Sequence, residues 1–242
     1  MDLGLTDRVY VVSGGTRGLG FAVARALTAE GARVVISGRN AGSLAAAVRE
    51  LGEPRAAGVA ADNADPESPE RLVGAAMDRW DRLDGALVNG GGPPVGSVAE
   101  VSDDIWRRSF ESVFLGAVRA ARVIADNLAG NGSMAFVLST SAHAPIPGLD
   151  ISNGLRPGLA MLMRTMATGL GSRGIRVNAL LPGRILTERT GYVDAGVPKT
   201  GVIPLGRSGE PGEFARVAAF VLSPAASYLS GAMIPVDGGA TA

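Results

Sequence analysis

The sequence predicts an α/β protein in which one doubly wound domain holds a parallel sheet of seven strands with helices on both faces. Strand and helix patterns alternate along the whole chain, the order that repeated βα units produce. The length of 242 residues suits one such domain spanning residues 1–242. Hydrophobic residues make up 46% of the chain and aromatic residues only 5%, so we expect a core of small aliphatic side chains packed against the sheet.

Each expected element follows from its hydrophobic periodicity. The strands are short apolar runs at 9–12, 33–37, 55–60, 83–88, 134–139, 175–181 and 233–236. The helices have apolar residues three and four positions apart, at 21–30, 41–51, 66–79, 103–128, 153–171 and 211–222. Ser102 is the expected N-cap of the longest helix. Ligands bind such sheets at the carboxyl ends of the strands, so the candidate loops begin at Ser13, Ser37, Ala61, Asn89, Ser139 and Pro182.

The first strand runs into the glycine-rich segment Ser13-Gly-Gly-Thr-Arg-Gly-Leu-Gly20, and a helix follows. Strand, tight turn and helix are the opening of a dinucleotide-binding βαβ unit. Gly14 permits the turn, Gly18 lets the backbone approach a pyrophosphate, and Gly20 lets the helix pack closely on the strand. The phosphates would bind at the helix N-terminus, where free N–H groups favour anions. The alternative is an ordinary strand–helix turn, but the flanking strand and amphipathic helix favour a nucleotide site.

Composition excludes several classes of site. The 23 basic and 23 acidic side chains balance, so we expect neither nucleic acid nor an anionic membrane as a partner. The chain has no cysteine, which excludes disulfides, thiolate catalysis and cysteine–zinc sites, and we expect no metal site. The first residues lack a secretory leader and no apolar run is long enough to span a bilayer, so we expect a cytoplasmic protein.

Motifs spread along the chain resemble those of the short-chain dehydrogenase/reductase family. In order, they are Ser13–Gly20, Asp62-Asn63, Asn89-Gly90-Gly91, Arg176-Val-Asn178 with Pro182-Gly183, and Ser230-Gly231 with Val236-Asp-Gly-Gly239. The resemblance covers essentially the full length. It implies a Rossmann fold that binds NAD(P) across the first and fourth strands, an oxidoreductase activity, a small substrate lid around 187–208, and a homotetramer or homodimer.

The resemblance also implies a role for individual residues in cofactor binding. Asp62 matches the acid that contacts adenine, Asn89 matches the first asparagine of the family's Asn-Asn-Ala-Gly, and Ile185 and Thr187 match the positions that hold the nicotinamide carboxamide. The full predicted set is Ser13, Gly14, Thr16, Arg17, Gly18, Leu19, Gly20, Ser37, Arg39, Asp62, Asn63, Asn89, Gly90, Gly91, Arg156, Pro182, Gly183, Ile185 and Thr187.

Charge near the second strand favours NADP over NAD. NAD-specific sites place an acid at the end of this strand, whereas here it ends in Ser37-Gly38-Arg39, with no acid. Arg17 in the glycine turn occupies a position where the resemblance implies a base in NADP-preferring members. Two guanidinium groups and the Ser37 hydroxyl could hold a 2′-phosphate through charge-assisted hydrogen bonds. The alternative for either arginine alone is a solvated surface charge.

The chain departs from the family at the catalytic positions. The family uses a serine after the fifth strand, then Tyr-x-x-x-Lys, and an asparagine in the preceding long helix. Ser139 keeps the first position, but Ser152 replaces the tyrosine, Arg156 replaces the lysine and Val113 replaces the asparagine. An aliphatic hydroxyl is far less acidic than a phenol with its pKa near 10, and a guanidinium keeps its proton. The usual proton transfer is therefore altered.

His143 is the candidate substitute for the missing acid, because a histidine can donate a proton near neutral pH. The alternative is a solvated or structural loop histidine. We therefore predict Ser139, Ser152, Arg156 and His143 as the catalytic set. Asp150 and Asn153 could reach the pocket mouth, and Tyr192 lies in the expected lid, where a tyrosine is usually a wall rather than an acid.

The sequence leaves three functions open. The first is an NADP(H)-dependent oxidoreductase acting on a small or medium carbonyl or alcohol through an atypical proton-transfer site. The second is a non-redox enzyme on the same scaffold, and the third is a regulatory protein that binds NADP(H). The retained nicotinamide-side motif favours the first, and the missing tyrosine favours the other two.

Overall fold

A computed structural model describes residues 2–191 and 203–242 and contains one seven-stranded sheet whose strands are all parallel, in the order β3-β2-β1-β4-β5-β6-β7. The strands are β1 (Val9–Val12), β2 (Arg33–Gly38), β3 (Ala56–Ala60), β4 (Gly85–Asn89), β5 (Ser133–Val137), β6 (Arg176–Pro182) and β7 (Met233–Val236). The strand order turns back between β1 and β4, so the loops after these two strands diverge and open a crevice of the kind in which doubly wound proteins bind ligands. The predicted fold class is confirmed.

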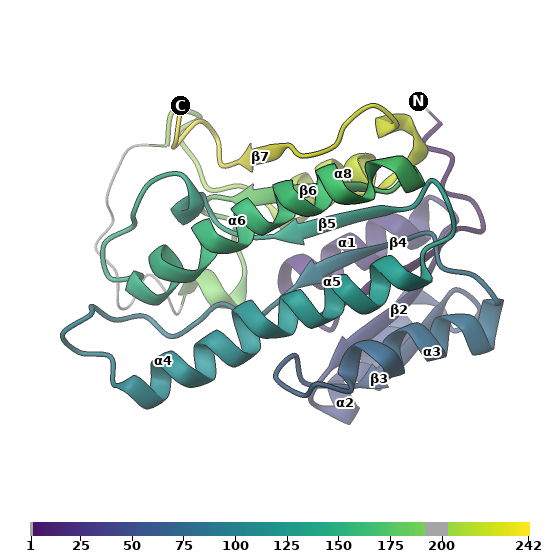
Figure 1. Cartoon of the computed structure of the whole chain (residues 1–242), viewed down its shortest axis with the longest axis horizontal. Helices are drawn as coiled ribbons and strands as arrows, with labels where there is room; N and C mark the ends of the chain where they lie inside the picture. Colours follow the sequence, from purple (N-terminus) through teal and green to yellow (C-terminus); the bar gives the residue numbers. More distant parts are fainter. Residues whose placement is uncertain (1, 192–202) are drawn as a thin grey trace.

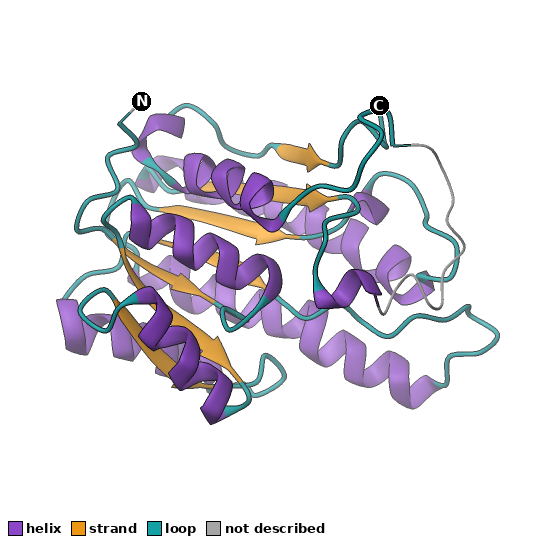
Figure 2. Cartoon of the chain, turned by 180° about the vertical axis from the view of Figure 1, so that it is seen from behind, coloured by secondary structure: helices purple, strands orange, loops and turns teal. Residues whose placement is uncertain are grey.

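Helices cover both faces of the sheet, as Figures 1 and 2 show from opposite sides. One face carries α1 (Gly18–Ala29), α2 (Ala41–Leu51) and α8 (Pro211–Leu222). The other carries α3 (Ser68–Trp80), α5 (Gly116–Asn127) and α6 (Asp150–Leu170). Each layer encloses its own core of mainly aliphatic side chains, because a parallel sheet must bury both of its faces.

The prediction of one uninterrupted helix over 103–128 is wrong. The structure has α4 (Asp103–Ser109), a π-helical segment η1 (Phe110–Leu115) and then α5. At the start of α5, a Cβ on Gly116 would lie 2.2 Å from the backbone oxygen of Asn63. The chain thus changes from π-helical to α-helical geometry where the loop after β3 packs against it. Ser102 does precede α4, but its side chain makes no cap hydrogen bond.

Other boundaries shift because side chains form local turns. Strand β5 ends at Val137, two residues early, since the Ser139 Oγ accepts a hydrogen bond from the Ser141 N–H at 3.1 Å and starts the 3₁₀ turn η2 (Thr140–Ala142). Helix α6 begins at Asp150, three residues earlier than predicted. Helix α3 begins at Ser68 rather than at residue 66, because the Ser68 N–H first bonds the Asp65 carbonyl.

Two further observations bear on the kind of site to expect. Among the described residues, no helix combines the length and the apolar character needed to cross a bilayer. The same residues contain no cluster of three or more histidine, cysteine, aspartate or glutamate side chains arranged to hold a metal ion.

Candidate functional site

The glycine turn after β1 has the conformation that its glycines allow. Gly14 has φ +61° and Gly18 has φ +56°, in the left-handed region that side chains disfavour. A Cβ on Gly20 would lie 2.2 Å from the Gly14 carbonyl oxygen, so only glycine lets α1 approach the turn this closely. The backbone therefore requires glycine at all three positions, at 14 and 18 for the positive φ and at 20 for the close approach.

The first turn of α1 presents free donors at its N-terminus. Its N-cap residue, Arg17, is extended and makes no side-chain cap hydrogen bond, and the first turn of this helix holds no acid. The first N–H groups of a helix have no partner within the helix, and the helix dipole adds a partial positive charge there. This end of α1 can therefore bind a phosphate group without displacing a protein side chain.

Two side chains lock the turn to the neighbouring strand β4. The Asn89 N–H donates to the Ser13 Oγ at 2.8 Å, and the Asn89 Nδ2 donates to the Gly14 carbonyl at 3.3 Å. Asn63 donates in turn to the Asn89 carbonyl at 3.3 Å. The loops after β1, β3 and β4 thus form one hydrogen-bonded group, which brings the predicted residues Ser13, Asn63 and Asn89 together.

Ser37 lies at a different place from the one predicted for it. Its side chain is buried, and its hydroxyl accepts a hydrogen bond from the Gly14 N–H at 2.9 Å. The side chain of Thr16 packs over the next residue, since a Cβ on Gly38 would come within 2.3 Å of its Cγ2. Ser37 therefore shapes the glycine turn and is not placed to contact an exposed 2′-phosphate.

Arg17 and Arg39 are exposed guanidinium groups, each with an acidic neighbour. Arg17 forms an ion pair with Glu188 at 2.8 Å, and both side chains are about three-quarters exposed. Arg39 lies 3.9 Å from Asp62, a looser pair. Exposed pairs of this kind contribute only about 0–1 kcal/mol, so a phosphate could replace either carboxylate at little cost.

The loops after β3 and β4 differ in how tightly they are held. Asp62 accepts a hydrogen bond from the Ala64 N–H at 3.0 Å, and its carbonyl accepts one from Ser68 at 2.7 Å. Gly90 and Gly91 carry no positive φ, and a Cβ on Gly91 would meet nothing within 4 Å. The first loop is thus fixed by its own contacts, while the second leaves open space beside the turn.

The segment after β6 lies across the glycine turn. A Cβ on Gly183 would be 2.5 Å from the Asp237 Cβ, so Pro182-Gly183 packs directly on the C-terminal loop. Ile185 is buried and forms a bridge with Gly209. The Thr187 side chain comes within 3.8 Å of where a Gly18 Cβ would stand. Among the predicted nicotinamide-side residues, Thr187 therefore lies beside the phosphate turn.

The two predicted catalytic serines are linked through a third. The Ser152 hydroxyl lies 2.9 Å from the Ser141 hydroxyl, and both side chains are buried. The Ser141 N–H in turn donates to the Ser139 Oγ. Ser141 is not among the predicted site residues, and the hydrogen bond across 11 positions is what brings it into the site. Val113, at the former asparagine position, is buried in the core.

Arg156 is a buried cation with few partners. It is only 5% exposed, its Nη1 donates to the Val137 carbonyl at 2.8 Å, and its Nε has no hydrogen-bond partner within the described part of the chain. Burial, and then the nearby charge of Arg189, lowers the pKa of Arg156 to about 10. It therefore stays positively charged near neutral pH. An unsatisfied buried polar atom of this kind is costly and fits a group prepared for a ligand.

The remaining candidates lie at the edge of this group. His143 is exposed on the loop after η2. Asn153 does not point into the pocket, because it bonds both the N–H and the carbonyl of Ile146 at 2.9 Å. Asp150 accepts a hydrogen bond from the Val98 N–H at 2.8 Å. Tyr192 and half of the predicted lid at 187–208, residues 192–202, lie outside the described residues.

Sequence reasoning missed Arg189, which lies in the helical turn 188–191. Its guanidinium donates to the Pro93 carbonyl in the loop after β4. The contact joins residues 96 positions apart, so no local pattern could have revealed it. The only hint was the unusual Gly-Gly-Gly-Pro-Pro run that it contacts.

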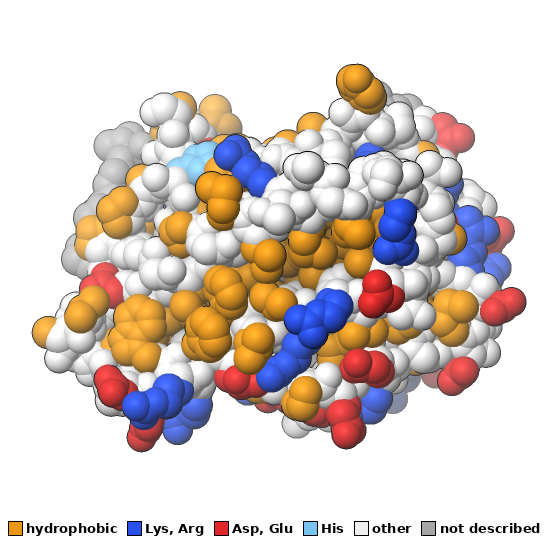
Figure 3. Space-filling view, in the orientation of Figure 1, with side chains coloured by type: hydrophobic (Ala, Val, Ile, Leu, Met, Phe, Trp, Pro, Cys, Tyr) orange, Lys and Arg blue, Asp and Glu red, His pale blue; other side chains and the backbone are white. Residues whose placement is uncertain are grey.

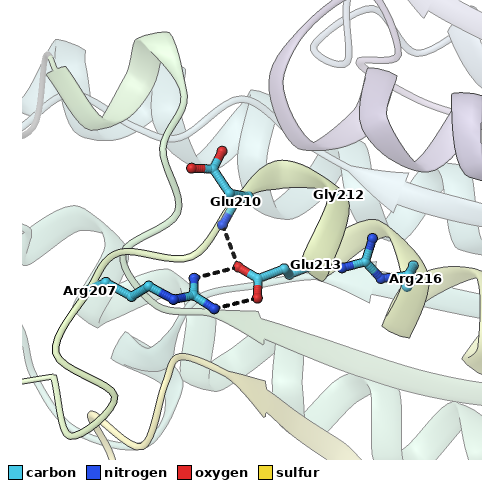
Figure 4. Close-up of a pocket in the computed structure, with 5 residues that line it drawn as sticks. All are labelled: Arg207, Glu210, Gly212, Glu213 and Arg216. Atoms are coloured by element: carbon cyan, nitrogen blue, oxygen red, sulfur yellow. Dashed lines mark hydrogen bonds and ion pairs between the residues drawn. The ribbon is translucent and has the colours of Figure 1, made fainter.

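A separate surface hollow shares no lining residue with this crevice. It is lined by Arg207, Glu210, Gly212, Glu213 and Arg216 at the start of α8 (Figure 4). Arg207 forms a two-pronged ion pair with Glu213, with both hydrogen bonds at 2.7 Å. Glu213 also accepts a hydrogen bond from the Glu210 N–H, which completes a capping box. These charges stabilise the helix start, and the hollow shows no sign of a reaction centre.

Comparison with known proteins gives matches over almost the whole chain. A family model described as "Enoyl-(Acyl carrier protein) reductase" matches residues 14–241. Dehydrogenase/reductase SDR family member 4 of Caenorhabditis elegans is 33% identical, over 97% of this chain and 95% of that protein. The crystal structure of L-sorbose reductase from Gluconobacter frateurii, complexed with NADPH and L-sorbose, superposes with a TM-score of 0.91 at 30% identity, covering 99% of this chain and 98% of that one.

A second similar structure is named for its atypical catalytic centre. It is a short-chain oxidoreductase from Pseudomonas aeruginosa PAO1 "containing an atypical catalytic center", with a TM-score of 0.89 and 27% identity over 99% of this chain and 98% of that one. The family model, the relative and the superposed structures each match almost the whole chain. This chain belongs to the short-chain dehydrogenase/reductase family of oxidoreductases.

Proposed function

We propose that this protein is an NADP(H)-dependent oxidoreductase that transfers a hydride to or from a small or medium carbonyl or alcohol substrate. One observation carries the proposal: the Thr187 side chain, on the Pro182–Thr187 segment, lies beside Gly18 in the glycine turn, next to the uncapped N-terminus of α1. A protein that bound only the adenine half of the dinucleotide would have no need of the Pro182–Thr187 segment. The dinucleotide, when bound, supplies or accepts the hydride.

The residues around the crevice fit the parts of a dinucleotide in order. The α1 N-terminus and Gly18 hold the pyrophosphate, and Asp62 lies at the adenine end. Arg156 binds the hydroxyls of the nicotinamide ribose, which would give its unsatisfied guanidinium a partner. Thr187 and Ile185 hold the carboxamide.

The choice of NADP over NAD rests on Arg17 and Arg39. Neither is buried, and each has only an exposed carboxylate as a neighbour. A 2′-phosphate carries more charge than a carboxylate and accepts more hydrogen bonds, so it would outcompete Glu188 and Asp62 for these guanidinium groups. The NADPH complex of the L-sorbose reductase supports the same choice by similarity.

Proton transfer in this site would differ from the family pattern. Reduction of a carbonyl adds a hydride to carbon and a proton to oxygen, and we propose that water supplies the proton through the Ser141–Ser152 hydroxyl pair. Each hydroxyl can donate and accept at once, so a proton can pass along the pair. Ser139, half-buried beside it, is placed to orient the substrate oxygen. His143 is the second candidate for the acid.

A binding titration followed by a turnover assay tests this function. NADPH and NADH are titrated separately into the purified protein, and nicotinamide absorbance is then followed with a panel of aldehydes, ketones and alcohols. We expect tighter binding of NADPH than of NADH, and slow turnover with some panel members. Arg156→Met should weaken NADPH binding, whereas Arg25→Gln, an exposed residue of α1, should not.

A regulatory or non-redox role is the second candidate, because the tyrosine position holds a serine whose hydroxyl is already bonded to Ser141. Tight NADPH binding with no turnover across the panel would favour this role. If neither dinucleotide binds, both candidates are excluded.

We also propose a homo-oligomer, a dimer or tetramer. Hydrophobic side chains gather over α4, η1, α5 and α6 on the face seen in Figure 3. Phe110 is 43% exposed and stacks on Phe114 with ring centroids 5.2 Å apart, and Met161 of α6 is 61% exposed. Exposed apolar patches of this kind commonly mark interfaces, and a second copy would cover this one. Light scattering measures the mass directly.

A further inference from the structure

Arg156 of α6 places a buried guanidinium at the carboxyl edge of the sheet. Its Nη1 donates to the carbonyl of Val137, the last residue of β5, at 2.8 Å. Val137 lies opposite Asn89, the last residue of β4, in the parallel ladder, and neighbouring strands run about 4.8 Å apart. Asn89 in turn donates to the Gly14 carbonyl of the glycine turn. Arg156 is therefore connected to the phosphate turn through hydrogen bonds and one strand pair.

The strand order decides which half of a dinucleotide meets Arg156. In the order β3-β2-β1-β4-β5, Arg156 lies at the end of β5, whereas Arg39 and Asp62 follow β2 and β3 on the other side of β1. A dinucleotide binds across the point between β1 and β4 where the order turns back. With its adenosine half beside Arg39 and Asp62, as proposed above, its nicotinamide half extends over β4 and β5 toward Arg156.

The guanidinium of Arg156 has no opposite charge beside it within the described residues. The side chain is only 5% exposed and forms no ion pair there, and its Nε has no hydrogen-bond partner. Burial is the largest of the effects that lower its pKa to about 10, so the group stays charged near neutral pH. Water and salt screen a buried charge much less than an exposed one. The charge therefore acts with little screening on a group bound beside it.

The two redox forms of the dinucleotide differ in charge at the nicotinamide ring. The oxidised ring carries one positive charge and the reduced ring carries none, whereas the phosphates are the same in both forms. The exposed Arg17 and Arg39, which are proposed to bind the 2′-phosphate, therefore act equally on the two forms. An unpaired cation near the ring repels only the oxidised form.

We propose that Arg156 makes this site selective for the oxidation state of its dinucleotide, so that NADPH binds more tightly than NADP⁺. The inference rests on the dinucleotide binding of the proposed function but not on turnover. A buried charge that acts on a neighbouring unit charge through an effective dielectric constant of about 20 changes an affinity by roughly 10- to 100-fold. The protein therefore takes up the reduced form and releases the oxidised form, which favours reduction of the substrate.

The ratio of two dissociation constants tests this inference. Calorimetry measures the Kd of NADPH and the Kd of NADP⁺ for the wild type, Arg156→Lys, Arg156→Met and the control Arg25→Gln. The wild type should bind NADPH roughly 10- to 100-fold more tightly than NADP⁺. Arg156→Met should bring the ratio close to one, and Arg156→Lys should keep most of it because it keeps the charge. Arg25→Gln, at an exposed position of α1, should leave the ratio unchanged.

The ratio separates this charge effect from a loss of ribose hydrogen bonds or of folded protein, because both of these weaken the two redox forms alike. High salt should weaken both forms through the exposed Arg17 and Arg39 but leave the ratio unchanged, since a buried charge is screened little. Equal affinities in the wild type, or a ratio that Arg156→Met retains, overturn the inference and leave the proposed oxidoreductase standing. Binding of neither form overturns both.

Discussion

The Ser152 hydroxyl lies 2.9 Å from the Ser141 hydroxyl, with both side chains buried beneath the loop after β5. The family resemblance implies an acidic tyrosine at position 152, whereas this chain has there a serine hydroxyl that is already bonded to a neighbour. This pair joins the helix α6 to the turn η2, and it can also carry a proton. The packing of α6 on η2 and the proposed proton transfer therefore depend on the same hydrogen bond.

Replacing Ser152 with alanine should lower both the stability of the fold and the rate of turnover. We expect Ser152→Ala to lower the free energy of unfolding by about 1 kcal/mol, because the buried Ser141 hydroxyl loses its partner. Turnover of an accepted substrate should fall by about 10²-fold, the lower end of what a positioned proton donor contributes. Chemical denaturation and steady-state kinetics measure the two effects. The control is Arg25→Gln, at an exposed position of α1, which should change neither; a loss of turnover in His143→Ala but not in Ser152→Ala would instead make His143 the acid.

Gly20→Ala should disrupt the phosphate turn. The added Cβ would stand 2.2 Å from the Gly14 carbonyl oxygen, so the turn or the helix must move. We expect lower stability and at least a tenfold loss of NADPH affinity, measured by thermal unfolding and fluorescence titration.

Gly74→Ala in α3 is the matched control for this change. A Cβ there would meet nothing within 4 Å, and alanine is favoured over glycine inside a helix by about 0.5–1 kcal/mol. The control should therefore be slightly more stable, with unchanged affinity. Equal behaviour of the two variants would show that the close approach of α1 to the turn is not needed for binding.

The ion pair between Arg17 and Glu188 should compete with a 2′-phosphate. Arg17→Gln should weaken NADPH binding about tenfold and leave NADH binding unchanged, because only NADPH carries the 2′-phosphate. Glu188→Gln should strengthen NADPH binding by up to about fivefold, the limit set by an exposed pair of about 1 kcal/mol. Titrations of both dinucleotides at two salt concentrations measure this. Parallel losses for NADPH and NADH in Arg17→Gln would contradict the assignment.

Stability toward acid should depend on the capping box at the start of α8 (Figure 4). The ion pair with Arg207 and the Glu210 N–H lower the pKa of Glu213 to about 2, from an ordinary value of 4.5. A lowered carboxyl pKa adds stability above pH 4.5, and that contribution disappears as the pH falls toward 2.

Thermal melts of the wild type and Glu213→Gln between pH 7 and pH 2 measure this effect. The wild type should have the higher Tm at neutral pH, and the difference should vanish at the acid end. The shift will be small because the pair is exposed. A Tm difference that grew as the pH fell would contradict this assignment.

Much of the fold was predictable because it depends on local rules. Hydrophobic periodicity located the strands and most helices, and the phosphate turn was evident because Gly14, Gly18 and Gly20 meet backbone demands that glycine alone satisfies. The resemblance located the altered positions 152 and 156, but it could not say what those side chains contact. Helix ends were less predictable, since Asp150 and Ser68 begin their helices through turns and side-chain bonds that no periodicity encodes.

By itself, the sequence determined the parallel α/β architecture and the glycine turn after the first strand, and it predicted a change at the position of the usual proton donor. Only the tertiary structure decided that Ser37 supports the turn from inside, that Ser141 holds Ser152, and that Arg189 reaches Pro93 near Arg156. The physical reason is the separation along the chain of the residues that interact. Propensity and periodicity act over a few neighbouring residues, whereas these contacts join residues far apart in the chain and exist only after the sheet has assembled.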